Sequence, residues 1–237
     1  MEEVEGRELR EGHRDRAVSV SEEALRLLRQ ELVEICRRSY ERGLVAGVSG
    51  NASIRLPGPD AGLVLIKSTG CSLGDMTVAD TMLMDLEGRA LEPGRQPSME
   101  WRWHLGLYRM RSDVGGVIHL HPPYTVAWAV ANQVPPLVHT AARGALERLD
   151  IVELAPSGSP ELAKLVLDAF GADPELRVAL MREHGMLAAA STLRAAFYLA
   201  DYLEDTAKVA LLSAQVVGAL GMREELSEVA PVGWRCG

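Results

Sequence analysis

Two histidines separated by a single residue are the first feature of this sequence that could do chemistry. His119 and His121 lie in an apolar run that is typical of a strand. Side chains two positions apart on a strand point to the same face, so both imidazoles could bind one divalent metal ion. Ordinary hydrogen-bonded or surface histidines are the alternative interpretation of the same pair.

A third histidine and a carboxylate extend this candidate site. His184 stands at the end of another expected strand, and Glu100 follows a short run of proline, serine and methionine. Three neutral imidazole nitrogens and a nearby carboxylate would make an open catalytic site for zinc or a similar divalent ion. Because 65 residues separate His119 from His184, spacing alone does not show that these groups meet.

The elements that must position these residues are short strands and longer helices. Apolar residues at helical spacing predict helices over 20–42, 98–111, 122–130, 160–170 and 193–220. Strand-like runs occupy 52–56, 63–67, 82–86, 114–120, 177–184 and 186–190. Since strands and helices do not alternate strictly, the pattern favours an α/β fold with a layered sheet over a barrel.

The beginning of the chain differs from the rest. Residues 1–18 are densely charged and without apolar periodicity, so we expect a mobile arm there and one domain over 19–237. Ser19 and Glu22 have the spacing of a capping box at the start of the first helix, and Gly43 follows the helix as a C-terminal cap.

Composition limits the classes of partner and compartment. The 237 residues carry a net charge of −8, which disfavours nucleic acid and anionic membrane surfaces as partners. No apolar stretch reaches the roughly 20 residues of a membrane-spanning helix. The start of the chain has no export signal, and its three cysteines lie far apart. A cytoplasmic protein is therefore expected.

Four segments, taken in order, resemble conserved blocks of the class II aldolase/adducin family. The resemblance covers roughly residues 22–212, and the four segments have the sequences GLVAGVSGNASIR, IKSTGCSLGDMTVADTMLMDLEGR, PSMEWRWHLGLYRMRSDVGGVIHLHPPYTVA and REHGMLAAASTLRAAFYLADYLEDTAK. The resemblance implies a single-domain α/β/α fold with a central, largely antiparallel mixed sheet. It also implies a homotetramer with active sites at subunit interfaces.

The same resemblance assigns roles to individual residues. It implies that His119, His121 and His184 bind the metal, and that Glu100 is the acid/base acting on carbon. Zinc is the expected ion, with manganese, cobalt or iron as alternatives. Positions matching the family's substrate-phosphate contacts are Gly50, Asn51, Thr69, Gly70 and Ser98. Glycines and small residues suit this role because they leave backbone N–H groups free to surround a phosphate, although the same tripeptides also form ordinary turns.

The activity implied is that of a metal-dependent lyase of carbohydrate metabolism. Its expected reaction is aldol cleavage of an L-fuculose-1-phosphate-like ketose phosphate to dihydroxyacetone phosphate and an aldehyde. His104, four residues after Glu100, lies on the same face of the expected helix, where it is either an orienting partner of Glu100 or an ordinary structural residue.

Two departures from the family pattern keep other activities open. Met99 stands where the sugar-phosphate aldolases carry a second serine, and Thr140 stands where they carry a tyrosine proton donor. Both favour, as a second hypothesis, a metal-dependent decarboxylase of a non-phosphorylated hydroxy-carboxylate. A sugar-phosphate 4-epimerase and a non-catalytic adducin-like module are the remaining alternatives.

Overall fold

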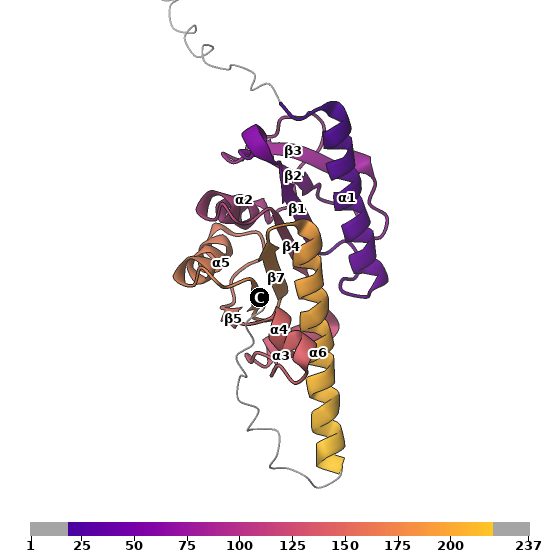
Figure 1. The fold of residues 1–237 in the computed structure, drawn as a ribbon, viewed down its shortest axis with the longest axis vertical. Coiled ribbons are helices and arrows are strands. Elements are labelled where there is room, and N and C mark those ends of the chain that lie inside the picture. Colours follow the sequence, from indigo (N-terminus) through magenta and orange to yellow (C-terminus); the bar gives the residue numbers. More distant parts are fainter. Residues whose placement is uncertain (1–18, 220–237) are drawn as a thin grey trace, which may run out of the picture.

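A mixed β-sheet forms the centre of the molecule. The computed structural model describes residues 19–219, and within this range seven strands lie in the order β3-β2-β1-β4-β7-β6-β5 (Figure 1). All neighbouring strands are antiparallel except β5 and β6. The strands are β1 (Asn51–Arg55), β2 (Leu63–Lys67), β3 (Thr81–Asp85), β4 (Gly116–Leu120), β5 (Leu149–Val152), β6 (Val178–Met181) and β7 (Gly185–Ala190). The expected central, largely antiparallel mixed sheet is confirmed.

Helices cover both faces of this sheet, which gives three layers. Helices α2 and α5 pack together on one face, while α1 and α6 run along the other, with α3 and α4 against the lower part of α6 (Figure 1). The helices are α1 (Glu22–Glu41), α2 (Trp101–Met110), α3 (Pro123–Val130), α4 (Thr140–Ala145), α5 (Pro160–Ala172) and α6 (Leu193–Ala219), and two short 3₁₀ turns span Gly58–Asp60 and Val78–Asp80.

Side chains along each strand point alternately to the two faces of the sheet, so they pack into two separate hydrophobic cores. On β4, Val117 packs into the core under α2 and α5, whereas Ile118 and Leu120 pack into the core under α1 and α6. Because both faces are covered, the strand reads as a nearly continuous apolar run. His119 is on the Val117 face and is fully buried, so the sheet holds this polar ring rigidly beneath α2.

Most element positions agree with the sequence-based expectations, and the differences have local causes. The capping box expected at Ser19 is wrong, because Ser21 is the N-cap and accepts a hydrogen bond from the Ala24 N–H. Gly43, at φ +72°, continues the chain beyond α1 as expected. Helix α4 and strand β5 were not expected, since one spans six residues and the other four, too few to show a period. The arm expected over 1–18 lies outside the described residues.

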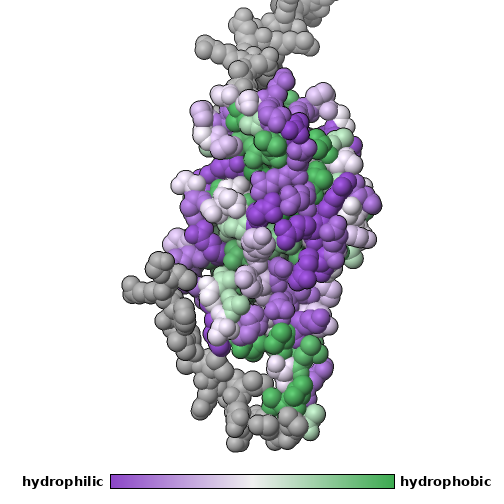
Figure 2. Space-filling view, turned by 45° about the vertical axis from the view of Figure 1, so that its right-hand side comes forward, coloured by the Kyte–Doolittle hydropathy of each residue, from purple (hydrophilic) through white to green (hydrophobic). Residues whose placement is uncertain are grey.

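The face of the molecule shown in Figure 2 carries both hydrophilic and hydrophobic side chains. Figure 2 shows hydrophobic side chains gathered at the lower end of the molecule, where α6 extends beyond the sheet. Leu211, Leu212 and Val216 are 38%, 43% and 58% exposed there. Within residues 19–219, no helix combines the length and apolar character needed to cross a membrane.

Candidate metal centre

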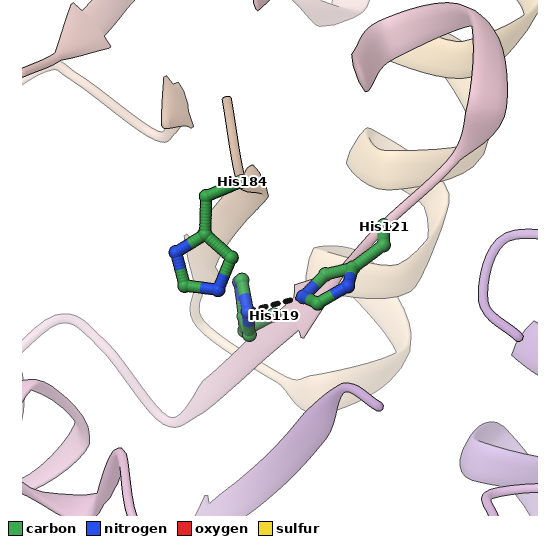
Figure 3. Close-up of side chains that lie close together, drawn as sticks. All are labelled: His119, His121 and His184. Carbon is green, nitrogen blue, oxygen red and sulfur yellow. Dashed lines mark hydrogen bonds between the residues drawn. The ribbon is translucent and has the colours of Figure 1, made fainter. Parts of the chain in front are cut away.

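Three neighbouring strands bring the candidate ligands together at one end of the sheet. Asn51 of β1 lies opposite His119 of β4, and His121 follows directly after the last residue of β4. His184 occupies the tight turn between β6 and β7, just before Gly185. The three histidine rings converge from these separate segments on one point (Figure 3). The expected meeting of His119, His121 and His184 is therefore present.

The ring nitrogens of these histidines fit a metal ion. One nitrogen from each ring lies within 4.8 Å of the others, and Nε2 of His121 is 2.8 Å from Nε2 of His119 (Figure 3). Imidazole nitrogens that share a tetrahedral zinc ion at ordinary bond lengths are ~3.3 Å apart. The cluster thus needs only small adjustments of its rings to bind such an ion.

Hydrogen bonding leaves the His119 lone pair pointing into the cluster. Its Nδ1–H donates to the Met186 carbonyl oxygen at 2.8 Å, so in the neutral ring Nε2 carries no proton. A carboxylate oxygen of Glu100, Oε2, lies 3.3 Å from that Nε2. Two groups that can only accept thus face each other, an arrangement that favours a cation between them.

Burial keeps these rings in the form that binds metal. It lowers the pKa of His119 and of His121 to about 3, helped by the neighbouring histidines, and it also lowers the pKa of His184. Neutral imidazoles are the metal-binding form, so the site is ready at neutral pH without proton release from these rings.

Glu100 is held at the edge of the histidine cluster by hydrogen bonds to both of its oxygens. Asn51 Nδ2 donates to Oε2 at 2.8 Å, and Ser157 Oγ donates to Oε1 at 2.7 Å. The same Oε1 lies 3.4 Å from Nε2 of His184. Glu100 is only 6% exposed, so its carboxylate is fixed beside the ligands and within reach of a molecule bound there.

The expected phosphate contacts occupy two places around the site. Ser98 and Thr69 are adjacent, because backbone bonds join Ser98 N to Lys67 O and Thr69 N to Gln96 O. Gly70 follows Thr69 with φ +82° and open space around its Cα. The other two expected phosphate contacts, Gly50 and Asn51, lie against the histidines. Gly50 packs on the His119 carbonyl, and both side-chain polar atoms of Asn51 are hydrogen bonded within the protein.

A hollow beside Glu100 includes a residue that sequence reasoning missed. Its volume is about 380 Å³, and its lining residues are Thr69, Gln96, Pro97, Met99, Trp101, Arg102, Ser157 and Gly158. Ser157 had no distinguishing signal, because it lies in a loop of proline, serine and glycine that looks like any turn. Met99 is 65% exposed, so its side chain adds apolar surface where a second serine was expected.

Replacing Gly185 by alanine is expected to disrupt metal binding. The added methyl group would lie 2.4 Å from the Leu120 carbonyl oxygen and 2.7 Å from Cδ2 of His121, so the chain or the ligand must move. We expect loss of about 1–3 kcal/mol of stability and substoichiometric metal. Metal analysis measures the stoichiometry of bound metal, and denaturant unfolding measures the stability. Gly144→Ala, with nothing within 4 Å, should leave both intact, and stoichiometric metal in Gly185→Ala would contradict this geometry.

Acid should destabilise the metal-free protein well above the pH at which its buried histidines titrate. Burial lowers the pKa of His104, His119 and His121 to about 3 in the folded protein, whereas the pKa of a histidine in the unfolded chain is about 6.5. Between these values the unfolded state holds more protons, so stability falls as pH falls, by at most ~1.4 kcal/mol per pH unit for each residue. Urea unfolding at pH 7, 6 and 5 measures this slope, and constant stability would refute it.

Comparisons with known proteins agree with this geometry. The family model for the Class II Aldolase and Adducin N-terminal domain matches residues 30–211. An L-fuculose phosphate aldolase of Methanococcus maripaludis is 30% identical over 179 residues, covering 76% of this chain and 93% of the relative. A 5-methylthioribulose-1-phosphate/5-deoxyribulose-1-phosphate aldolase of Rhodospirillum rubrum is 34% identical over 182 residues, covering 76% and 79%.

Structural comparison leads to the same family. A solved L-fuculose 1-phosphate aldolase superposes with a TM-score of 0.71 at 26% identity, covering 91% of this chain and 92% of that one. The family match spans more than half of the chain and includes His119 and His121, the β6–β7 turn and Glu100. With its layered sheet and its converging histidines, the chain belongs to the class II aldolase and adducin family.

Proposed function

We propose that this enzyme, a carbon–carbon lyase of the class II aldolase type, cleaves an L-fuculose-1-phosphate-like ketose phosphate to dihydroxyacetone phosphate and an aldehyde. The observation that carries the proposal is the position of Glu100. Its carboxylate lies 3.3 Å and 3.4 Å from Nε2 of His119 and His184, respectively, and accepts a hydrogen bond from Ser157, which lines an open hollow. An acid/base group therefore stands beside a divalent-metal site and a space for substrate.

In this proposal Glu100 handles the proton on carbon. In the cleavage direction it delivers a proton to C3 of the developing dihydroxyacetone phosphate, and in the condensation direction it removes that proton. Asn51 and Ser157 hold the carboxylate in place for both steps. When bound by His119, His121 and His184, the divalent ion supplies positive charge that favours negative charge on the substrate oxygens.

The phosphate is proposed to bind beside this carboxylate. Thr69 lines the hollow and offers its hydroxyl, and the adjacent Ser98 and Gly70 offer a second hydroxyl and an open glycine backbone. Gly50 and Asn51 lie nearer the histidines. Lys67 is 2% exposed and donates to the Ser68 carbonyl, so its positive charge adds to the field at this end of β2.

Metal identity, assembly and location complete the proposal. Three imidazole donors suit zinc, and manganese, cobalt or iron could bind to the same ligands.

The exposed apolar side chains near the end of α6 support contact with further copies of the chain, and we propose a homotetramer in the cytoplasm. Sedimentation that found a stable, active monomer would contradict the assembly.

Condensation assays test the reaction and its main rival. Zinc-loaded protein is incubated with dihydroxyacetone phosphate and a panel of aldehydes, including lactaldehyde, and the ketose 1-phosphate is detected by NMR. New ketose phosphate with consumption of the aldehyde supports the proposal. Met99, which occupies the expected serine position, favours a decarboxylase as the second candidate. Carbon dioxide release from hydroxy-carboxylates, without any condensation product, would replace the aldolase assignment.

A further inference from the structure

A row of buried polar side chains runs behind Glu100, away from the histidine cluster. Glu100, His104 and Tyr108 follow one another at intervals of four residues along α2, and Asn51 and Ser53 lie on the same face of β1. Asn51 is 3% exposed, Tyr108 is 2% exposed, and Ser53 and His104 are fully buried. Apolar side chains surround the row in the core beneath α2, so this polar row is a distinct feature of that core.

Hydrogen bonds connect the row without a break from Glu100 to Tyr108. Asn51 Nδ2 lies 2.8 Å from Glu100 Oε2, and Asn51 Oδ1 lies 2.6 Å from His104 Nε2. His104 Nδ1 lies 2.7 Å from Ser53 Oγ. The Tyr108 hydroxyl lies 2.8 Å from that Oγ and also donates to the Ser53 carbonyl at 2.9 Å.

The negative charge of Glu100 sets the direction of every proton in this row. An ionised carboxylate only accepts, so Asn51 must present its NH₂ group to Glu100 and its carbonyl oxygen to His104. His104 must then carry its proton on Nε2 and accept at Nδ1. Ser53 donates its single hydroxyl proton to that Nδ1, and the single Tyr108 proton goes to the Ser53 carbonyl oxygen. The direction of each hydrogen bond from Glu100 to Ser53 Oγ is therefore fixed.

We propose that His104 is a positioning residue for the catalytic carboxylate. By donating from Nε2 to the Asn51 side-chain oxygen, it prevents the amide from rotating, and the fixed Asn51 N–H then holds Glu100 Oε2 towards the three histidines. If His104 were absent, the Asn51 oxygen would lose the contact that anchors it, so the amide could move and the carboxylate could move with it. The role rests on the proposed function, because it assigns His104 to the same carbon acid/base step.

Two observations separate this role from simple filling of the core. Burying polar groups here costs free energy that an apolar set of the same size would avoid, yet the row is polar throughout and ends on the acid/base residue. Burial also lowers the pKa of His104 to about 3, so the ring stays neutral with a single proton at any working pH. A neutral His104 ring with its one proton on a fixed nitrogen can hold the Asn51 amide in a single orientation.

The first test reads the His104 proton directly and needs no substrate. Proton–nitrogen NMR of ¹⁵N-histidine-labelled, metal-loaded protein distinguishes the two neutral tautomers, and His104→Gln identifies the signal. We expect the Nε2–H form with a slowly exchanging proton at neutral pH. Asn51→Leu should expose that proton to faster exchange. An Nδ1–H tautomer in the wild-type protein would overturn the proposal.

The second test compares two amide replacements. Glutamine at position 104 places its NH₂ near the former Nε2 and can still donate to Asn51, whereas asparagine reaches only the former Nδ1 position and pairs with Ser53. We expect His104→Asn to lower kcat for proton exchange from dihydroxyacetone phosphate by about 10–100-fold, with KM and metal content unchanged. His104→Gln should recover most of the rate. Equal losses in the two variants would overturn the role.

A double-mutant cycle shows whether His104 acts through Glu100. In a Glu100→Ala background, His104→Asn should change the residual exchange rate by less than about 2-fold, because the carboxylate it positions is absent. The same 10–100-fold loss in both backgrounds would mean an independent, structural effect. If the wild-type protein gives no exchange, the proposed function fails, while the tautomer measurement still decides the His104 hydrogen bond.

Discussion

Glu100→Gln is expected to slow proton exchange at C3 of dihydroxyacetone phosphate by about 10²–10⁴-fold while leaving the metal bound. Glutamine has the shape of glutamate, and its one carbonyl oxygen can still accept from Asn51. Its NH₂ group can donate to the Ser157 hydroxyl, which is able to accept as well as donate. It cannot take up or return a proton at working pH. The ligands His119, His121 and His184 are unchanged, so metal analysis should give wild-type stoichiometry.

A matched carboxylate on the surface provides the control for this variant. Glu41 ends α1 and is exposed, so Glu41→Gln removes the same charge without touching the site. Exchange rates of this control should equal those of the wild-type protein. Full activity in metal-loaded Glu100→Gln would remove Glu100 from the mechanism, and metal loss in that variant would show that Glu100 serves mainly as a ligand.

His119→Ala is expected to abolish both metal binding and turnover. His119 is fully buried, and its Nδ1–H is fixed on the Met186 carbonyl. Its Nε2 lies 2.8 Å from Nε2 of His121 and 3.3 Å from Oε2 of Glu100. Removing the ring leaves two ligands and an open gap. Metal that stabilises the folded state contributes about 2.7 kcal/mol at a free concentration of 100 Kd, so the variant should lose the added thermal stability that metal gives the wild-type protein.

The control for this second variant is a histidine outside the cluster. His139 caps α4 by accepting from the Ala142 N–H and lies 3.2 Å from an Asp205 carboxylate oxygen. His139→Ala should lose some stability but keep stoichiometric metal and a metal-dependent rise in melting temperature. Wild-type metal affinity in His119→Ala would contradict the three-histidine site.

The closeness of His119 and His121 could be predicted from the sequence because it depends on a short-range rule. His119 and His121 share a face through the two-residue period of a strand, and their strand is apolar on both sides. The placement of His184 against them depends on β4 pairing with β7, a contact between segments distant in sequence. Family resemblance, rather than residue spacing, supplied that contact.

The hydrogen bonds around Glu100 could be predicted only in part from the sequence. The interval of four residues between Glu100 and His104 is visible in the sequence and predicts a shared helix face. The link between them is Asn51, which comes from β1 and reaches both only after α2 packs on the sheet. Ser157 comes from a loop whose conformation has no periodic signal, so its bond to Glu100 is visible only in the structure.

Exchange of the C3 protons of dihydroxyacetone phosphate with solvent tests the central claim most directly, because it needs no knowledge of the aldehyde. Zinc-loaded wild-type protein is incubated with dihydroxyacetone phosphate in D₂O, and the intensity of the C3 proton signal is followed by NMR, where exchange of one proton halves it. We expect loss of one of the two prochiral protons, with exchange abolished by chelation and strongly slowed in Glu100→Gln. Retention of both protons by a verified metal-loaded protein would contradict the aldolase assignment.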